Sequence, residues 1–262
     1  MNDTPGSKPA QTWAAGVLAN DPTDNPTDVP TDVPNNVPSN AVAWLPCHRL
    51  IASRFPTVGL YDQIASPEDF DVVFAIEALT NPRVRQELGQ LSLVPPADRV
   101  AGPGATLIMA AFTHLNPLGS RFSDGSWGVY YAADSLDTAV AEVGHHRKAF
   151  LARTSEDAID IDLRWIQADL RAELHDLRGQ GTTMRSVYNR DDYGAGQDLG
   201  RQLRSQHSHG IVYDSVRRPD SQCAAVFKPK ALSNARATGH ISLHWDGRTI
   251  SHWFEKGAPH AM

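Results

Sequence analysis

Seven polar and aromatic side chains stand out because their types, taken together, suit the chemistry of a dinucleotide. An arginine presents a planar fork of donors that matches diphosphate oxygens, and a tyrosine offers a flat ring to stack on a nicotinamide. A carboxylate can stabilise the positive charge that forms on a ribose when a glycosidic bond breaks. The residues that carry these groups are Arg49, Arg54, Arg121, Tyr130, Tyr131, Glu142 and Ser215.

The same residues also have an ordinary structural interpretation. The tyrosines would then belong to the core, the arginines to surface ion pairs, and Glu142 to a solvated helix face. Taken alone, the spacing favours this second interpretation, because such residues are common in any α+β domain. The elements that position the side chains therefore matter.

The most informative stretch is 119–146. A loop with three glycines leads into an expected strand, 129–133, and then into a helix that Asp134 or Ser135 can cap. A core-facing stripe at the spacing i, i+3, i+4, i+7 follows, made of Leu136, Ala139, Val140 and Val143. Glu142 borders that stripe at about 60° from its nearest member, so we expect its carboxylate at a half-buried edge.

Expected strands and helices alternate irregularly in the rest of the folded domain's sequence. We expect a strand and loop over 42–56, a helix from Ser66 to Asn81, and helical character in the mixed sequence before residue 178. A loop and an amphipathic helix are expected over 191–206, followed by strands over 210–216, 223–229 and 240–245. The apolar run 107–112 is too short to assign. Without repeated βαβ units, the pattern favours an α+β fold over a doubly wound parallel sheet.

Composition divides the 262 residues near position 40. In the first 40 residues a proline recurs every four positions from Pro22 to Pro38, which rules out a helix, and little can be buried. We expect a disordered Pro/Asp-rich tail over 1–40 and one folded domain over 41–262. Five acidic residues against one lysine give the tail −4 of the net charge of −6. The tail is either a partner-binding segment or a tolerated extension.

Several classes of protein are disfavoured. A negative net charge is the wrong sign for non-specific binding to nucleic acid, so we expect no direct nucleic-acid contact. No apolar run approaches a membrane span, and the N-terminus lacks the layout of a secretory signal, so we expect a soluble, cytoplasmic protein without membrane contact. The two cysteines, Cys47 and Cys223, are expected to be free, buried thiols.

The spacing of the residues argues against other catalytic and binding motifs. The glycines of 194–200 resemble a dinucleotide fingerprint, but the third comes one residue late and no apolar strand precedes them. No P-loop and no G-x-S-x-G elbow occur. The histidine clusters at 145–146, 207–209 and 240–244 lack acidic or cysteine partners at a recognised ligand spacing, so we expect no metal.

The sequence resembles the RES-domain family, toxins of bacterial RES/Xre-type toxin–antitoxin pairs, over roughly residues 45–245. The segments that carry the likeness are HRLIASRFP, GSRFSDGSWGVYYAADSLDTAVAEVGHH and HGIVYDSVRRPDSQCAAVF. The middle segment carries the family's signature: an arginine in a Gly-rich loop, a tyrosine-bearing strand ten residues on, and a helix with A-x-x-E. Two features depart from the family: the acidic tail, and Ser123-Asp124 where many relatives have Asn-Pro-like text.

Residue by residue, the resemblance implies a site. Arg49 corresponds to the family's first arginine, with Arg54 as a competing candidate, and Arg121 corresponds to the second. The stacking tyrosine, the catalytic glutamate and the serine then correspond to Tyr131, Glu142 and Ser215. In this picture the arginines hold the diphosphate, and the serine bonds to nicotinamide or ribose.

The resemblance also implies a fold and a function. We expect an ADP-ribosyltransferase-like α+β fold, with mixed sheets and flanking helices, that takes NAD as substrate and cleaves its nicotinamide–ribose bond. Such a toxin depletes NAD by transfer to water or phosphate; the alternatives are a protein ADP-ribosyltransferase toxin and a catalytically inactive NAD- or partner-binding module. The expected partner is an Xre-type antitoxin, whose helix-turn-helix domain would make any DNA contact. A homodimer is left open.

Overall fold

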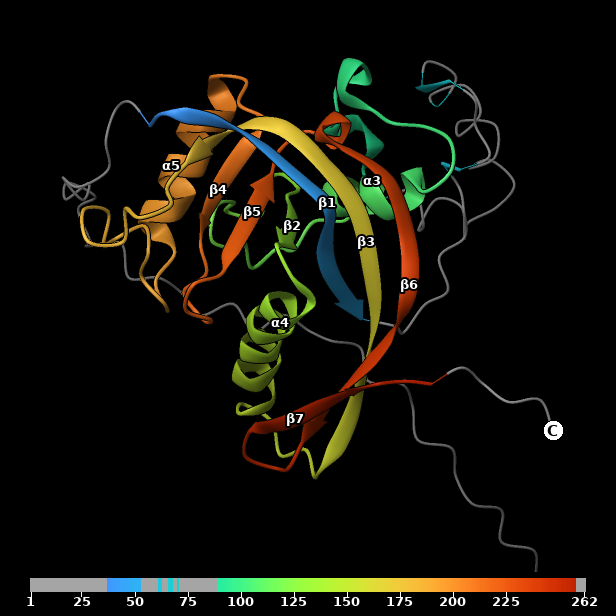
Figure 1. Ribbon diagram of the computed structural model, residues 1–262, viewed down its shortest axis with the longest axis vertical. Coiled ribbons are helices and arrows are strands. Elements are labelled where there is room, and N and C mark those ends of the chain that lie inside the picture. The colour runs from blue at the N-terminus through green and yellow to red at the C-terminus, as the bar shows by residue number, and fades with distance from the viewer. Residues whose placement is uncertain (1–36, 53–60, 63–65, 68–69, 71–88, 258–262) are drawn as a thin grey trace, which may run out of the picture.

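The computed structural model describes residues 37–52, 61–62, 66–67, 70 and 89–257, and its strands form one curled sheet with helices around it (Figure 1). The strands are β1 (Ser39–Ala52), β2 (Tyr130–Ala133), β3 (Ile159–Asp176), β4 (Gly210–Asp214), β5 (Gln222–Val226), β6 (Leu232–Trp245) and β7 (Ile250–Glu255). The helices are α3 (Ala105–Thr113), α4 (Leu136–Leu151) and α5 (Gly194–Ser205), with 3-10 turns at Leu91–Leu93, Pro96–Asp98 and Pro229–Ala231.

Strand pairing closes part of the sheet on itself. The order is β1-β2-β5-β4-β3-β6-β7, and β1 also pairs along most of β3, so that β1, β2, β5, β4 and β3 form a closed circuit. Only β3 and β4 pair in parallel; the other neighbours are antiparallel. The described residues thus combine strands and helices without repeated βαβ units, and the predicted α+β class is confirmed.

The long strand β3 replaces the helical character expected before residue 178. Helix-forming residues such as those of QADLRAEL misled the prediction, because sheet pairing on both sides of the strand overrides local propensity. The buried positions along β3 are Leu163, Ile166, Ala168, Leu170 and Leu174. Their parity changes where the register with β6 shifts between Trp165 and Ile166, so no simple alternation marks the strand in the sequence.

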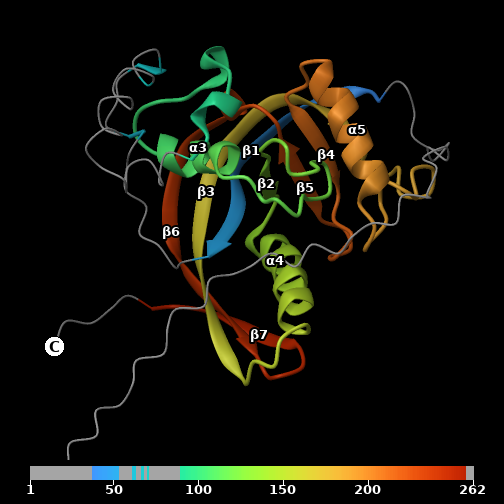
Figure 2. The same ribbon diagram turned by 180° about the vertical axis from the view of Figure 1, so that it is seen from behind.

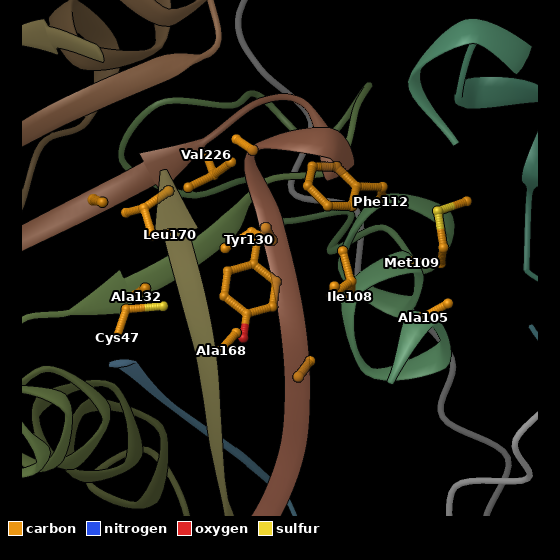
Figure 3. Close-up of a cluster of buried hydrophobic side chains, with 14 of the residues drawn as sticks. Cys47, Ala105, Ile108, Met109, Phe112, Tyr130, Ala132, Ala168, Leu170 and Val226 are labelled. Carbon is orange, nitrogen blue, oxygen red and sulfur yellow. The ribbon is translucent and has the colours of Figure 1, made fainter. Parts of the chain in front are cut away.

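Three clusters of buried side chains hold the elements together. The first fills the space between the strand circuit and α3, where Figure 3 shows Tyr130 among core side chains that include Leu170 and Ile108. The second lies under α5 against β4 and β5, and the third joins α4 to β1, β2, β3, β6 and β7. Seen from behind, α3 and α5 lie on opposite sides of the strands, with α4 below them (Figure 2). Both cysteines are buried and free, as predicted.

Some predictions lie wholly or mostly outside the described residues. These are the tail, of which the structure describes only 37–40, most of the helix expected from Ser66 to Asn81, and Arg54. Of the expected tail, Ser39 and Asn40 already belong to β1, two residues before the predicted start of the domain. No helix in the described ranges is long and apolar enough to cross a membrane.

A carboxylate at the end of β3 ties the strand to its surroundings and predicts a pH dependence. Asp176 accepts hydrogen bonds from Arg178 Nε at 2.9 Å and from Asn40 Nδ2 at 2.9 Å. Chiefly because of the bonds from Arg178, its pKa is lowered from 3.8 to about 2. The folded pKa lies below the unfolded one, so this stability is present above about pH 4 and is lost as the pH falls toward 2.

Asp176→Asn should therefore lower the free energy of unfolding by about 1 kcal/mol at pH 7. The difference from wild type should shrink below about pH 4, because the Asp176 carboxyl group protonates in the unfolded chain while it is still ionised in the folded protein. Urea unfolding at pH 7, 5, 4 and 3 measures both effects. An equal difference at pH 7 and pH 3 would contradict the ionic origin.

Candidate active site

Helix α4 begins two residues after β2 and carries Glu142 on its second turn. The side chain of Ser135 caps the helix by accepting from the backbone N–H of Thr138 at 3.3 Å. Ala139 and Val140 are buried on the face toward the strands. Because the cap and the buried stripe fix the rotation of the helix, Glu142 is half-buried at the edge of the stripe, as predicted.

One oxygen of Glu142 is held by residues from β5 and from the turn after β4. Ser215 donates its hydroxyl proton to Glu142 Oε1 at 2.6 Å, and Cys223 Sγ lies 3.7 Å from the same oxygen. Ser215 Oγ in turn accepts from the backbone N–H groups of Arg217 at 3.2 Å and Arg218 at 3.1 Å. With its lone pairs engaged, the hydroxyl must direct its only proton to the carboxylate. Among the described residues no hydrogen bond reaches Glu142 Oε2.

The thiol of Cys223 remains protonated beside this carboxylate. Burial raises its pKa well above the ordinary value, and the negative charge of Glu142 raises it further. The protonated thiol is a weak donor toward Oε1 and a poor nucleophile. Its place in the site is therefore structural support for Glu142.

The phenol of Tyr131 is fixed by the loop before β2. Its oxygen accepts from the backbone N–H of Phe122 at 2.9 Å and shares a proton with Ser120 Oγ at 2.8 Å. Burial is the main reason that its pKa is raised to about 12. Tyr131 is thus a neutral, half-buried ring in a fixed orientation, which suits stacking rather than proton transfer.

The guanidinium of Arg121 lies against a neighbouring loop. Its Nη1 donates to the backbone oxygens of Val187 at 2.9 Å and Asn189 at 2.7 Å, and its Cζ lies 4.7 Å from the ring centroid of Tyr193. The residue is 7% exposed. Bonds to carbonyl groups leave its positive charge unneutralised, so Arg121 keeps its attraction for an anion.

Contacts through β4 and β5 connect these side chains. Tyr213 pairs with Cys223, which lies beside Glu142. The ring centroid of Tyr213 lies 5.1 Å from that of Phe122, which follows Arg121 and whose N–H orients Tyr131. The pKa of Tyr213 is raised mainly by burial, and the charges of Glu142 and Arg121 both act on it, in opposite directions. The pKa of His146 is lowered mainly by desolvation, and the same two charges act on it as well. Arg121 also acts on the phenol of Tyr131. A cation, an aromatic ring and a carboxylate therefore share one region.

Tyr130 lies on the other face of β2 from Tyr131, and Arg49 contacts both residues. Successive residues of a strand point to opposite faces, so Tyr130 points into the core while Tyr131 packs under the α5 side. The guanidinium Cζ of Arg49 lies 4.5 Å from the ring centroid of Tyr130, and its Nη1 donates to the backbone oxygen of Tyr131 at 2.9 Å. Tyr130 is fully buried, and its hydroxyl has no hydrogen-bond partner within the described part of the chain.

A cavity of about 350 Å³ opens beside Arg49, between β1, α3 and the loop before β2. Ser120 and Tyr131 also line it, whereas Glu142 does not. Arg49 and the proposed stacking residue Tyr131 thus line one cavity.

Of the residues predicted from the sequence, the structure brings together Arg121, Tyr131, Glu142 and Ser215. Tyr130 points to the opposite face of β2, whereas Arg49 donates to the backbone oxygen of Tyr131 and lines the same cavity as Tyr131. The sequence analysis did not propose Cys223 or Arg217, although both adjoin the Glu142–Ser215 pair. The nearest signal for Arg217 was its place two residues after the predicted serine. Among the described residues, no three His, Cys, Asp or Glu side chains form a group that could hold a metal ion.

Comparison with known proteins gives a family match. Residues 96–246, more than half of the chain, match the family model described as RES domain. The protein y4oC of Sinorhizobium fredii (strain NBRC 101917 / NGR234) is 33% identical over 206 residues, which cover 78% of this chain and 84% of that protein. A solved M. tuberculosis MbcT–MbcA toxin–antitoxin complex contains a chain that is 11% identical, with a TM-score of 0.39, over 79% of this chain and 85% of that one. That structural likeness is too weak to carry an argument.

Proposed function

Because the chain belongs to the RES-domain family, we propose that it is an enzyme that takes NAD as substrate and breaks the bond between nicotinamide and ribose. The observation that carries the proposal is the carboxylate of Glu142. Ser215 fixes its Oε1, while within the described residues no hydrogen bond occupies its Oε2. A carboxylate held in this way can face a developing positive charge without reorganising.

In the proposed reaction, the C1′–N bond of the nicotinamide ribose breaks, and its electron pair goes to the nicotinamide nitrogen. The pyridinium ring thereby becomes neutral, and the positive charge passes to the ribose as an oxocarbenium ion. Glu142 stabilises that ion, since opposite charges attract strongly in a site partly shielded from water. Ser215 is a positioning residue in this scheme, because its only proton is directed to Glu142.

The neighbouring side chains can bind the nicotinamide and the diphosphate of the substrate. The fixed ring of Tyr131 offers a face on which a nicotinamide can stack, and the charge of Arg121 attracts the diphosphate. An acceptor oxygen, from water or inorganic phosphate, then bonds to C1′ and loses its proton to the solvent. The products are nicotinamide and either ADP-ribose or its 1″-phosphate.

The family resemblance supports a biological role for this reaction. We propose that the protein is the toxin of a bacterial toxin–antitoxin pair, that it acts by depleting NAD, and that an antitoxin with a helix-turn-helix domain neutralises it.

Nicotinamide release from NAD by the purified chain tests the enzymatic proposal. We expect nicotinamide in equal amount to the NAD consumed, and comparing buffers with and without phosphate identifies the acceptor from the second product. Absence of release in both buffers would overturn the proposal. If calorimetry then showed NAD binding without turnover, the chain would be an NAD-binding module.

A further inference from the structure

Two arginines from distant parts of the chain meet on one short loop beside the proposed site. Arg121 donates to the backbone oxygens of Val187 and Asn189, and Arg217 Nη2 donates to the backbone oxygen of Arg190. Since Asn189 and Arg190 are consecutive, their carbonyl groups lie within a few ångströms of each other. The guanidinium groups of Arg121 and Arg217, called the arginine pair below, therefore lie close together.

The guanidinium of Arg217 has unused donors. Its Nε is buried and has no hydrogen-bond partner, and no carboxylate of the described residues lies within ion-pair distance of it. A buried donor without an acceptor destabilises a protein, so such a group calls for an acceptor. The next residue provides a contrast: Arg218 donates to Asp137 at 3.2 Å and to Ser135 at 3.3 Å.

The backbone places Arg217 directly beside the proposed catalytic carboxylate. Its N–H donates to Ser215 Oγ at 3.2 Å, and that hydroxyl donates to Glu142 at 2.6 Å. The charges of both members of the arginine pair also act on His146, one helical turn beyond Glu142. Two cations without carboxylate partners thus flank the place where the ribose of NAD is proposed to react.

Arg49 is less suited to join Arg121 there. It contacts the ring of Tyr130 and the backbone of Tyr131, and no hydrogen bond among the described residues links it to the loop carbonyls to which Arg121 and Arg217 donate. The second cation next to Arg121 is therefore the guanidinium of Arg217.

We propose that Arg217 binds a phosphoryl oxygen of the substrate, so that the arginine pair holds the diphosphate of NAD. This inference rests on the proposed function, because it assigns a binding residue to the same site. Arg217 would be a substrate-binding residue, and its Nε–H would gain the acceptor it lacks.

Steady-state NAD cleavage by wild type, Arg217→Gln and Arg217→Lys tests the assignment. We expect Arg217→Gln to raise KM by about 10- to 100-fold, the equivalent of one lost hydrogen-bonded charge, with kcat within about threefold of wild type. Arg217→Lys should lie between them, because an ammonium keeps the charge without the fork. As a matched control, Arg201→Gln removes an exposed arginine of α5 that pairs with Asp198 and Asp124, and it should leave KM unchanged.

The possible results separate the two proposals. If wild type cleaves NAD and Arg217→Gln keeps the wild-type KM, or loses kcat alone, Arg217 only supports the loop and the inference is wrong. Direct NAD binding to Glu142→Gln, with and without Arg217→Gln, gives the same answer without turnover: equal affinities would also overturn it. If wild type does not cleave NAD, the proposed function fails first. If Arg217→Gln does not fold, the KM of Arg217→Lys is the deciding measurement. A KM equal to that of wild type would show that the substrate makes no contact that needs the fork of the guanidinium.

Discussion

Glu142→Gln is expected to lower kcat for NAD cleavage by about 10³-fold or more while changing KM by less than about threefold. Removing a single hydrogen-bond donor from a site that stabilises a transition-state charge lowers kcat by about 10²–10³, and here a full charge is removed. The substitution preserves shape, and the amide oxygen can still accept from Ser215. The loss should therefore appear in the chemical step and not in substrate binding.

Nicotinamide release under saturating NAD measures this effect, and Glu255→Gln is its matched control. Glu255 is exposed on β7, so the same change there should leave kcat unaltered. In cells, expression of the wild type should lower NAD and arrest growth, whereas Glu142→Gln should do neither. If a neighbouring gene encodes a helix-turn-helix protein, the proposed role predicts that its co-expression relieves the arrest. Turnover by Glu142→Gln at more than a tenth of the wild-type rate would refute the assigned role.

The parts of the fold that could be predicted depend on local signals. Ser135 and the apolar stripe of α4 are close in sequence, so helix start, rotation and the half-buried edge at Glu142 followed from spacing alone. The strand at Tyr130–Ala133 and the final strands also carry local patterns. These signals act within one or two turns of the chain and do not depend on which elements later pack together.

The parts that could not be predicted depend on pairing between distant segments. Strand β3 has helix-forming residues, and only its pairing with β1 and β6 makes it a strand. Likewise, only the pairing of β1 with β2 and β3 brings Arg49 against the backbone of Tyr131, 82 residues later. The site of Arg217 depends on a carbonyl at Arg190, 27 residues earlier. Chemistry on such residues can be proposed from a sequence, but which of them meet is decided by topology.

The glycines of α5 also show the difference between what local sequence predicts and what packing of distant segments adds. The sequence rules out a dinucleotide fingerprint at 194–200, and the structure supplies a packing reason for two of these glycines. A Cβ at Gly196 would lie 2.4 Å from the backbone oxygen of Arg121, and a Cβ at Gly200 would lie 2.1 Å from that of Phe122. Helix α5 therefore packs directly on the loop that contains Arg121 and orients Tyr131.

Gly200→Ala should consequently destabilise the protein by about 3 kcal/mol, because backbone atoms cannot yield as a flexible side chain could. The melting temperature should fall by about 6–12 °C for a domain of this size, as measured by calorimetry. Gly144→Ala in α4 is the matched control: its Cβ would meet no atom within 4 Å, so it should stabilise the helix by up to about 1 kcal/mol.

The substitution should also weaken NAD binding at temperatures where the variant remains folded. To make room for the methyl group, α5 must move away from Phe122, whose backbone N–H orients Tyr131, and from the backbone of Arg121 next to it. A destabilised Gly200→Ala protein that binds NAD as tightly as wild type would show that the loop keeps its position without α5. Equal stability of Gly200→Ala and Gly144→Ala would contradict the close packing itself. Gly196 meets the backbone of Arg121, and Gly200 meets that of Phe122, whose N–H orients Tyr131, so this packing links the stability of α5 to the proposed binding of NAD.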